Sequence, residues 1–133
     1  MLKVGEKYTH TFSFSQEDVI AFAKVTGDNN PVHLDEDYAA ATMFKKPIMH
    51  GMLGASIFSK VFGTLFPGEG TIYLNQNIQF TRPMYAGDQY EAQFEIVEID
   101  SEKHRAKITT SIVNIEGKTV ILGDATLMHT TQF

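Results

Sequence analysis

The chain has 133 residues, of which 43% are hydrophobic and 20% are charged, and it carries a formal net charge of −5. This composition is typical of a single globular domain over residues 1–133 and argues against a disordered chain. The negative charge argues against nucleic-acid binding, which needs a basic surface, and the absence of cysteine excludes disulfides, thiolate metal sites and cysteine nucleophiles.

The first forty residues predict one strand and two short helices. Aromatic residues alternate with polar ones within residues 3–14, which is typical of a strand. The first ten residues lack the apolar core of a signal peptide, so we expect a cytoplasmic protein. Ser15 opens a capping box, apolar residues follow at helical spacing, and Gly27 is placed to end that helix. A second short helix is expected to start near Asp35 and to run to position 41.

Residues 50–66 predict a helix that is apolar on nearly every side and therefore buried. This run is too short to span a bilayer, so we expect no membrane insertion. From Thr71 onward the hydrophobic period changes from 3.6 to 2, and residues 119–129 form the last of four expected strands. The expected inward faces of the first three strands are Ile72, Leu74, Ile78 and Phe80; Tyr90, Ala92, Phe94 and Ile96; and Ala106, Ile108, Thr110 and Ile112. Helices set apart from a run of strands predict an α+β fold, a curved antiparallel sheet with the apolar helix against one face.

The segment TGDNNPVH, residues 26–33, contains the two most reactive side chains of the first helical region, Asp28 and His33. The Asn30-Pro31 pair biases Asn30 away from the α region and predicts a turn. Loops held between rigid elements commonly carry catalytic groups, and a five-residue separation lets the two side chains converge on one point. The segment therefore predicts an acid–base pair rather than a simple connection.

Three segments resemble the (R)-specific enoyl-CoA hydratases, the MaoC-like branch of the hot-dog fold. The most specific is Phe22 followed by VTGDNNPVH (residues 25–33) and Ala39; PIMHGMLGASIFS (residues 47–59) and Phe80-x-x-Pro83 with Gly87-Asp88 support it. The resemblance covers nearly the whole chain. It implies a long central helix wrapped by a curved antiparallel sheet of about five strands, in agreement with the hydrophobic pattern.

The same resemblance implies an activity and a catalytic pair. Asp28 and His33 would activate one water for addition to a trans-2-enoyl thioester, giving the (R)-3-hydroxyacyl thioester, and the reverse reaction is a dehydration. No cofactor is implied beyond the coenzyme A or acyl carrier protein on the substrate. The residues alone do not decide which of Asp28 and His33 is the base, because burial and a neighbouring imidazole shift a carboxyl pKa in opposite directions.

Further site residues are expected around the buried helix. Gly51 lies at its N-terminal end, where a backbone N–H without a partner can bind the thioester oxyanion, and the resemblance implies this role. Ser59 matches a family active-site serine; it lies about 12 Å farther along the helix, so it is expected to orient Asp28 or His33 instead. The residues expected to contact substrate are Asn30, Met52 and Gln76.

No metal site is expected, because the five histidines show no pair at helical ligand spacing, and His50 is interpreted as structural. Two other functions remain open: an acyl thioesterase on the same fold and a non-catalytic module that binds acyl thioesters. The exposed edge of a hot-dog sheet and the family resemblance both predict a homodimer.

Overall fold

A computed structural model describes residues 1–133 and contains one five-stranded antiparallel sheet and four helices. The strands, in their order across the sheet, are β1 (Lys7–Phe12), β3 (Tyr90–Asp100), β4 (Arg105–Asn114), β5 (Thr119–Met128) and β2 (Ile72–Phe80). The helices are α1 (Gln16–Thr26), α2 (Pro31–Leu34), α3 (Glu36–Ala40) and α4 (Gly51–Thr64). The predicted α+β architecture is confirmed.

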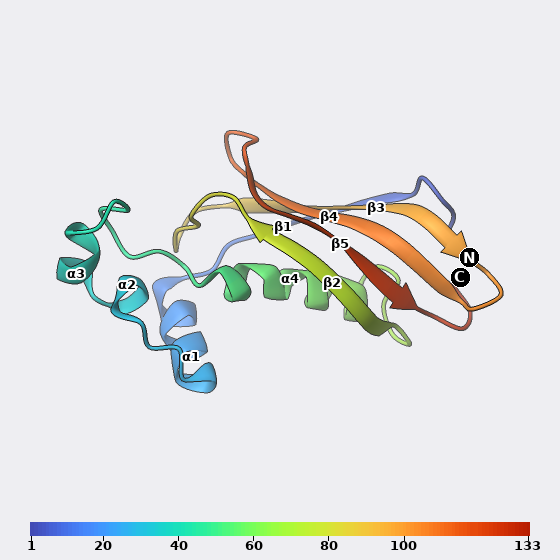
Figure 1. Cartoon of the computed structure of the whole chain (residues 1–133), viewed down its shortest axis with the longest axis horizontal. Coiled ribbons are helices and arrows are strands. Elements are labelled where there is room, and N and C mark those ends of the chain that lie inside the picture. Colours follow the sequence, from blue (N-terminus) through green and yellow to red (C-terminus); the bar gives the residue numbers. More distant parts are fainter.

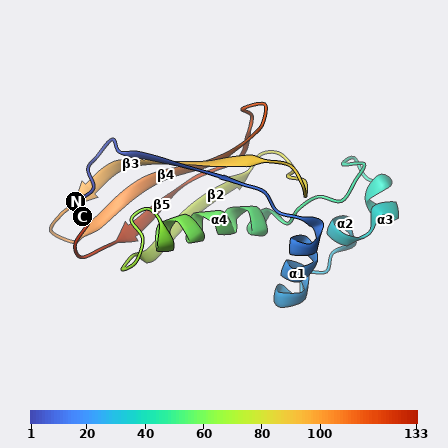
Figure 2. The same cartoon turned by 180° about the vertical axis from the view of Figure 1, so that it is seen from behind.

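Helix α4 lies along one face of the sheet, and α1, α2 and α3 gather beyond the sheet near the start of α4 (Figures 1 and 2). One hydrophobic core contains six residues of α4, among them Leu53, Phe58 and Phe62, together with the inward side chains of the strands. None of the four helices has the length and apolar character needed to cross a membrane. The fold therefore leaves the N-terminal end of α4 beside the small helices.

Strands β3 and β4 follow the predicted alternation. Their buried residues are Tyr90, Ala92, Phe94 and Ile96 on β3 and Ala106, Ile108, Thr110 and Ile112 on β4. Alternation marks these strands because one face packs on the core and the other faces water.

The predicted inward face of β2 is wrong at its start, and its last residue, Phe80, is 50% exposed and lines the cleft described below. A β-bulge between Tyr73 and Asn75 inserts one extra residue, so Ile72 and Leu74 are exposed. Tyr73 lies on the core side instead: its ring packs edge-on against Phe62 with centroids 5.2 Å apart, while 38% of the residue stays exposed. Burial raises the pKa of the Tyr73 hydroxyl to about 12.

The helix signals before residue 30 are confirmed, whereas the turn predicted at Asn30-Pro31 is a helix start. Ser15 forms the capping box of α1, and Gly27 ends it with φ 83°. Asn30 caps α2 by accepting a hydrogen bond from the Val32 N–H, and Pro31 occupies the first helical position, where its missing N–H costs nothing. His33 therefore projects from a capped helical turn.

Candidate active site

A cleft of about 510 Å³ opens beside the first turn of α4. Its lining comes from four places: the segment around α2, residues 43–52 leading into α4, residues 80–84 at the end of β2, and Ile121 on β5. Asp28, His33 and Gly51 all line it. The three residues predicted to carry the chemistry therefore share one cavity.

His33 is held with one ring nitrogen fixed and the other free. The side chain is 9% exposed, and its Nδ1 lies 2.7 Å from the carbonyl oxygen of Ile48. A carbonyl only accepts hydrogen bonds, so Nδ1 carries the proton and Nε2 carries a lone pair. Burial lowers the pKa of His33, and the neighbouring His50 adds to this, while the Ile48 carbonyl and Asp28 act in the opposite direction. The net effect favours the neutral imidazole, whose Nε2 can accept a hydrogen bond or a proton.

Asp28 follows Gly27, the left-handed C-cap of α1, and local hydrogen bonds hold its backbone and its carboxylate. Its N–H donates to Thr26 Oγ1 at 3.2 Å, and its carboxylate accepts from the Asn30 N–H at 3.4 Å. A carboxylate oxygen of Asp28 and ring nitrogens of His33 and His50 all lie within 4.8 Å of one another. One water molecule can therefore contact both Asp28 and His33.

Gly51 supplies an unpaired backbone donor at the edge of the cleft. It is the first residue of α4, and neither its N–H nor that of Met52 has a backbone acceptor. Both groups lie at the positive end of the helix dipole, where a developing oxyanion is stabilised. A Cβ on Gly51 would lie 2.6 Å from Cε1 of Phe80, so the close approach of this ring requires glycine.

His50 is a site residue that the sequence-based interpretation missed. It is 2% exposed, and its Nε2–H donates to the backbone carbonyl of Asp28 at 2.9 Å. Its ring stacks on His33 with centroids 3.8 Å apart and contacts Phe22 on α1 at 4.8 Å. The only signal in the sequence was its position next to Gly51.

A family model for the MaoC like domain matches residues 2–118. The chain belongs to the MaoC-like family. It is 41% identical over 124 residues to the (R)-specific enoyl-CoA hydratase of Aeromonas caviae, covering 93% of this chain and 92% of that protein. It is 37% identical to the 3-hydroxybutyryl-CoA dehydratase of Methylorubrum extorquens, over 93% of this chain and 78% of that protein.

Solved structures give the same result for the fold. The (R)-hydratase from A. caviae superposes with a TM-score of 0.93 at 40% identity, covering 96% of this chain and 97% of that one. The R-hydratase from Pseudomonas aeruginosa superposes with a TM-score of 0.91 at 44% identity, covering 96% and 82%. The hot-dog fold of this MaoC-like chain is therefore established by neighbours of substantial identity.

Three residues predicted to belong to the site lie outside the cleft of the MaoC-like chain. Asn30 does not line it, because its side chain caps α2. Ser59 is exposed on α4 and makes no hydrogen bond to Asp28 or His33, because two helical turns separate it from Gly51. Met52, by contrast, lines the cleft and is 61% exposed.

Gln76 is the third residue outside the cleft, and its amide is satisfied elsewhere. Its Nε2 donates to Thr110 Oγ1 at 2.9 Å and to the Asn77 carbonyl at 2.8 Å, and its Oε1 accepts from the Tyr73 hydroxyl. The side chain crosses β5 over Gly123 to reach Thr110. The predicted contact of Gln76 with substrate is therefore replaced by a polar cluster inside the sheet.

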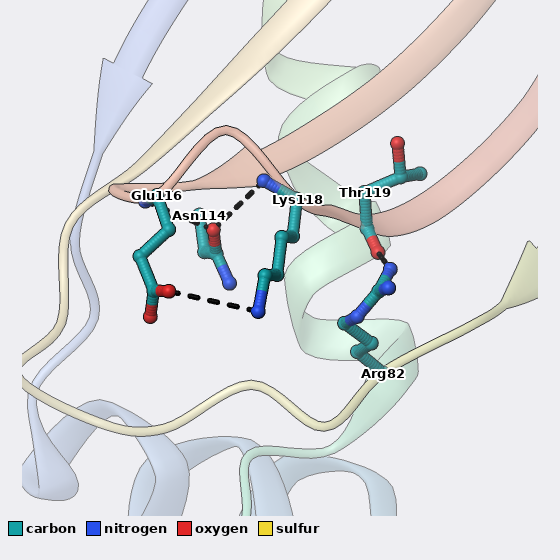
Figure 3. Close-up of polar contacts among 5 residues, drawn as sticks. All are labelled: Arg82, Asn114, Glu116, Lys118 and Thr119. Carbon is teal, nitrogen blue, oxygen red and sulfur yellow. Dashed lines mark hydrogen bonds and ion pairs between the residues drawn. The ribbon is translucent and has the colours of Figure 1, made fainter.

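Arg82 joins the wall of the cleft to the β4–β5 turn. Its guanidinium donates to the Thr119 carbonyl at 2.7 Å, and the Thr81 hydroxyl donates to the same oxygen at 2.8 Å. Figure 3 shows Arg82 reaching Thr119 beside the turn, where Lys118 pairs with Glu116 at 3.6 Å. These bonds hold residues 80–84 against β5 and so fix that side of the cleft.

Proposed function

We propose that this chain is a hydro-lyase that interconverts trans-2-enoyl and (R)-3-hydroxyacyl thioesters. The observation that carries the proposal is the meeting of a neutral His33, a carboxylate at Asp28 and the unpaired N–H of Gly51 in one cleft. The names of its relatives, hydratases and dehydratases of acyl thioesters, support the same reaction.

In the hydration direction, His33 Nε2 takes a proton from a water whose oxygen forms a bond to C3. The Asp28 carboxylate accepts the second hydrogen bond of that water and orients it. Electrons move from the C2–C3 double bond onto the thioester oxygen, where the N–H of Gly51 stabilises the charge. The proton held by the Asp28–His33 pair then returns to C2, so one water is added and the pair regains its first state.

The proposed reaction moves only water and protons, so it needs no cofactor apart from the carrier of the acyl group. Both carriers occur among the relatives: a coenzyme A enzyme in A. caviae and a mitochondrial 3-hydroxyacyl-[acyl-carrier-protein] dehydratase in Solanum lycopersicum, 35% identical over 96% of this chain. The proposed substrates are therefore acyl thioesters, with either coenzyme A or acyl carrier protein as the carrier.

The direct test follows the loss of enoyl absorbance with a short 2-enoyl-CoA, with chiral analysis of the product. We expect the (R)-3-hydroxyacyl product, and nearly complete loss of rate in Asp28→Asn and His33→Ala with the fold retained. Release of free thiol would identify a thioesterase instead. Tight binding of the thioester without turnover would identify a binding module.

We also propose that the chain forms a homodimer through the free edge of β2. This strand pairs only with β5, and Ile72, Leu74 and Phe80 on it are large exposed apolar residues. An exposed apolar edge strand of this kind invites pairing with a second copy. Light scattering should give twice the mass of the 14.9 kDa chain, and a monomeric mass at micromolar concentration would contradict the proposal.

A further inference from the structure

His50 connects the three elements that form one side of the active site. It lies directly before α4, its Nε2–H reaches the Asp28 carbonyl, and its ring lies between His33 on α2 and Phe22 on α1. Because Nε2 donates to a carbonyl, it carries a proton. A single buried side chain thus contacts both members of the catalytic pair.

In its observed orientation, the side chain of His50 does not cap α4. The N-cap side chains of α1, α2 and α3 each accept a hydrogen bond from the first turn of their helix, whereas the side chain of His50, the N-cap of α4, makes no capping hydrogen bond. Its Nδ1 is buried without any partner. Both features lower stability, since a capping side chain and a satisfied polar atom each stabilise a fold. The contacts of the His50 side chain are therefore made with Asp28 and His33 and not with α4, the helix that it precedes.

We propose that His50 is a positioning residue, whose Nε2–H donation to the Asp28 carbonyl and ring contact with His33 set the separation of the catalytic pair. This inference rests on the proposed hydratase function. Binding of a metal by His50 is a weaker explanation, because Nε2 holds the proton and Nδ1 is enclosed. An error of about 1 Å in the placement of reacting groups can cost about 100-fold in rate.

Two amide substitutions separate this role from a merely structural one. In His50→Gln the amide nitrogen lies where Nε2 of the imidazole lies, so it reaches the Asp28 carbonyl. In His50→Asn it lies at the position of Nδ1, too close to the backbone to reach. Asn is also a strong N-cap, so this variant is expected to fold with a melting temperature at or above that of the wild type. His50→Ser, which caps but does not reach, repeats the comparison with a second side chain.

We expect kcat/KM to fall about 100-fold in His50→Asn and His50→Ser but less than about tenfold in His50→Gln, with the loss mainly in kcat. Equal activity in folded Gln and Asn variants, whether high or low, would overturn the inference, because reach to the Asp28 carbonyl would then not matter.

A measurement without substrate keeps the inference separate from the proposed function. Nitrogen-15 spectra of the imidazoles should show the Nε2–H tautomer for His50 and the Nδ1–H tautomer for His33. Hydrogen exchange at the Asn30 amide, which donates to the Asp28 carboxylate, should be faster in His50→Asn than in His50→Gln. An Nδ1–H tautomer for His50 overturns the inference even if the enzyme is a hydratase. Failure of the wild type to hydrate any enoyl thioester overturns the function alone.

Discussion

The ring of Phe80 occupies the space that a side chain on Gly51 would need. A Cβ built on Gly51 lies 2.6 Å from Cε1 and 2.7 Å from Cδ1 of Phe80, well inside van der Waals contact. Phe80 is 50% exposed and lines the cleft, so it cannot be displaced without altering the cleft wall. The absence of a side chain at Gly51, the proposed oxyanion donor, is therefore a packing requirement.

Gly51→Ala should lower kcat/KM by at least about tenfold, because the ring and the first turn of α4 must move apart and misalign the N–H donor. The matched control is Gly63→Ala on the same helix, where an added Cβ meets nothing within 4 Å. Steady-state kinetics should show that the control keeps its activity. Similar rates for the two variants would show that the approach of Phe80 does not position the donor.

The pH profile of kcat/KM should have an acidic limb below pH 6.5, because His33 accepts a proton only in its neutral form and burial lowers its pKa from 6.5. Asp28 and His50 are the charged or titratable groups that act on it. The pKa of His10 is also lowered, by burial and by Lys60, but His10 lies outside the cleft. His10→Gln should therefore leave the limb unchanged, and a limb that moves with His10 would reject His33 as its source.

The parts of the fold that were predicted correctly are those that depend on local patterns. Alternation on β3 and β4 marks which side chains are buried, and Ser15 and Gly27 mark the ends of α1. The bulge in β2 could not be read, because one inserted residue exchanges the two faces of a strand without any special residue type at Leu74. Local sequence patterns predict where a helix or strand lies, whereas the register of a strand depends on the strand with which it pairs.

The same distinction between local patterns and tertiary contacts applies to the site residues. Asp28 and His33 were predicted from an acid and an imidazole in one short loop together with the family resemblance, and Gly51 from its place at the start of the buried helix and the same resemblance. The role of His50 depends on a carbonyl 22 positions earlier in the chain, and the partners of Gln76 depend on Gly123 between two strands. Such contacts follow from the tertiary fold, so a single sequence does not reveal them.

The free energy of unfolding should decrease as the pH is lowered below about 6.5, in part because of His33. The folded state lowers the pKa of this imidazole, so below the unfolded value the unfolded chain binds more protons. The penalty is absent above pH 6.5 and develops as the pH falls through the range between the unfolded and folded pKa values. Urea unfolding at several pH values should show that the free energy of unfolding changes less steeply with pH in His33→Phe than in the wild type. Identical slopes would show that His33 titrates normally in the folded protein.

Gly123→Ala should destabilise the protein more than Gly51→Ala or Gly63→Ala does. A Cβ at this position would lie 1.8 Å from the carbonyl oxygen of Asn77 on β2 and 3.2 Å from Nε2 of Gln76. Backbone cannot yield as a flexible side chain does, so β2 must separate locally from β5 and the Gln76–Thr110 bond is lost. We expect the free energy of unfolding to fall by about 3 kcal/mol or more, measured by urea denaturation, whereas Gly63→Ala should raise it by up to about 1 kcal/mol. Equal stabilities for the two variants would mean that β2 does not pack over Gly123 as described.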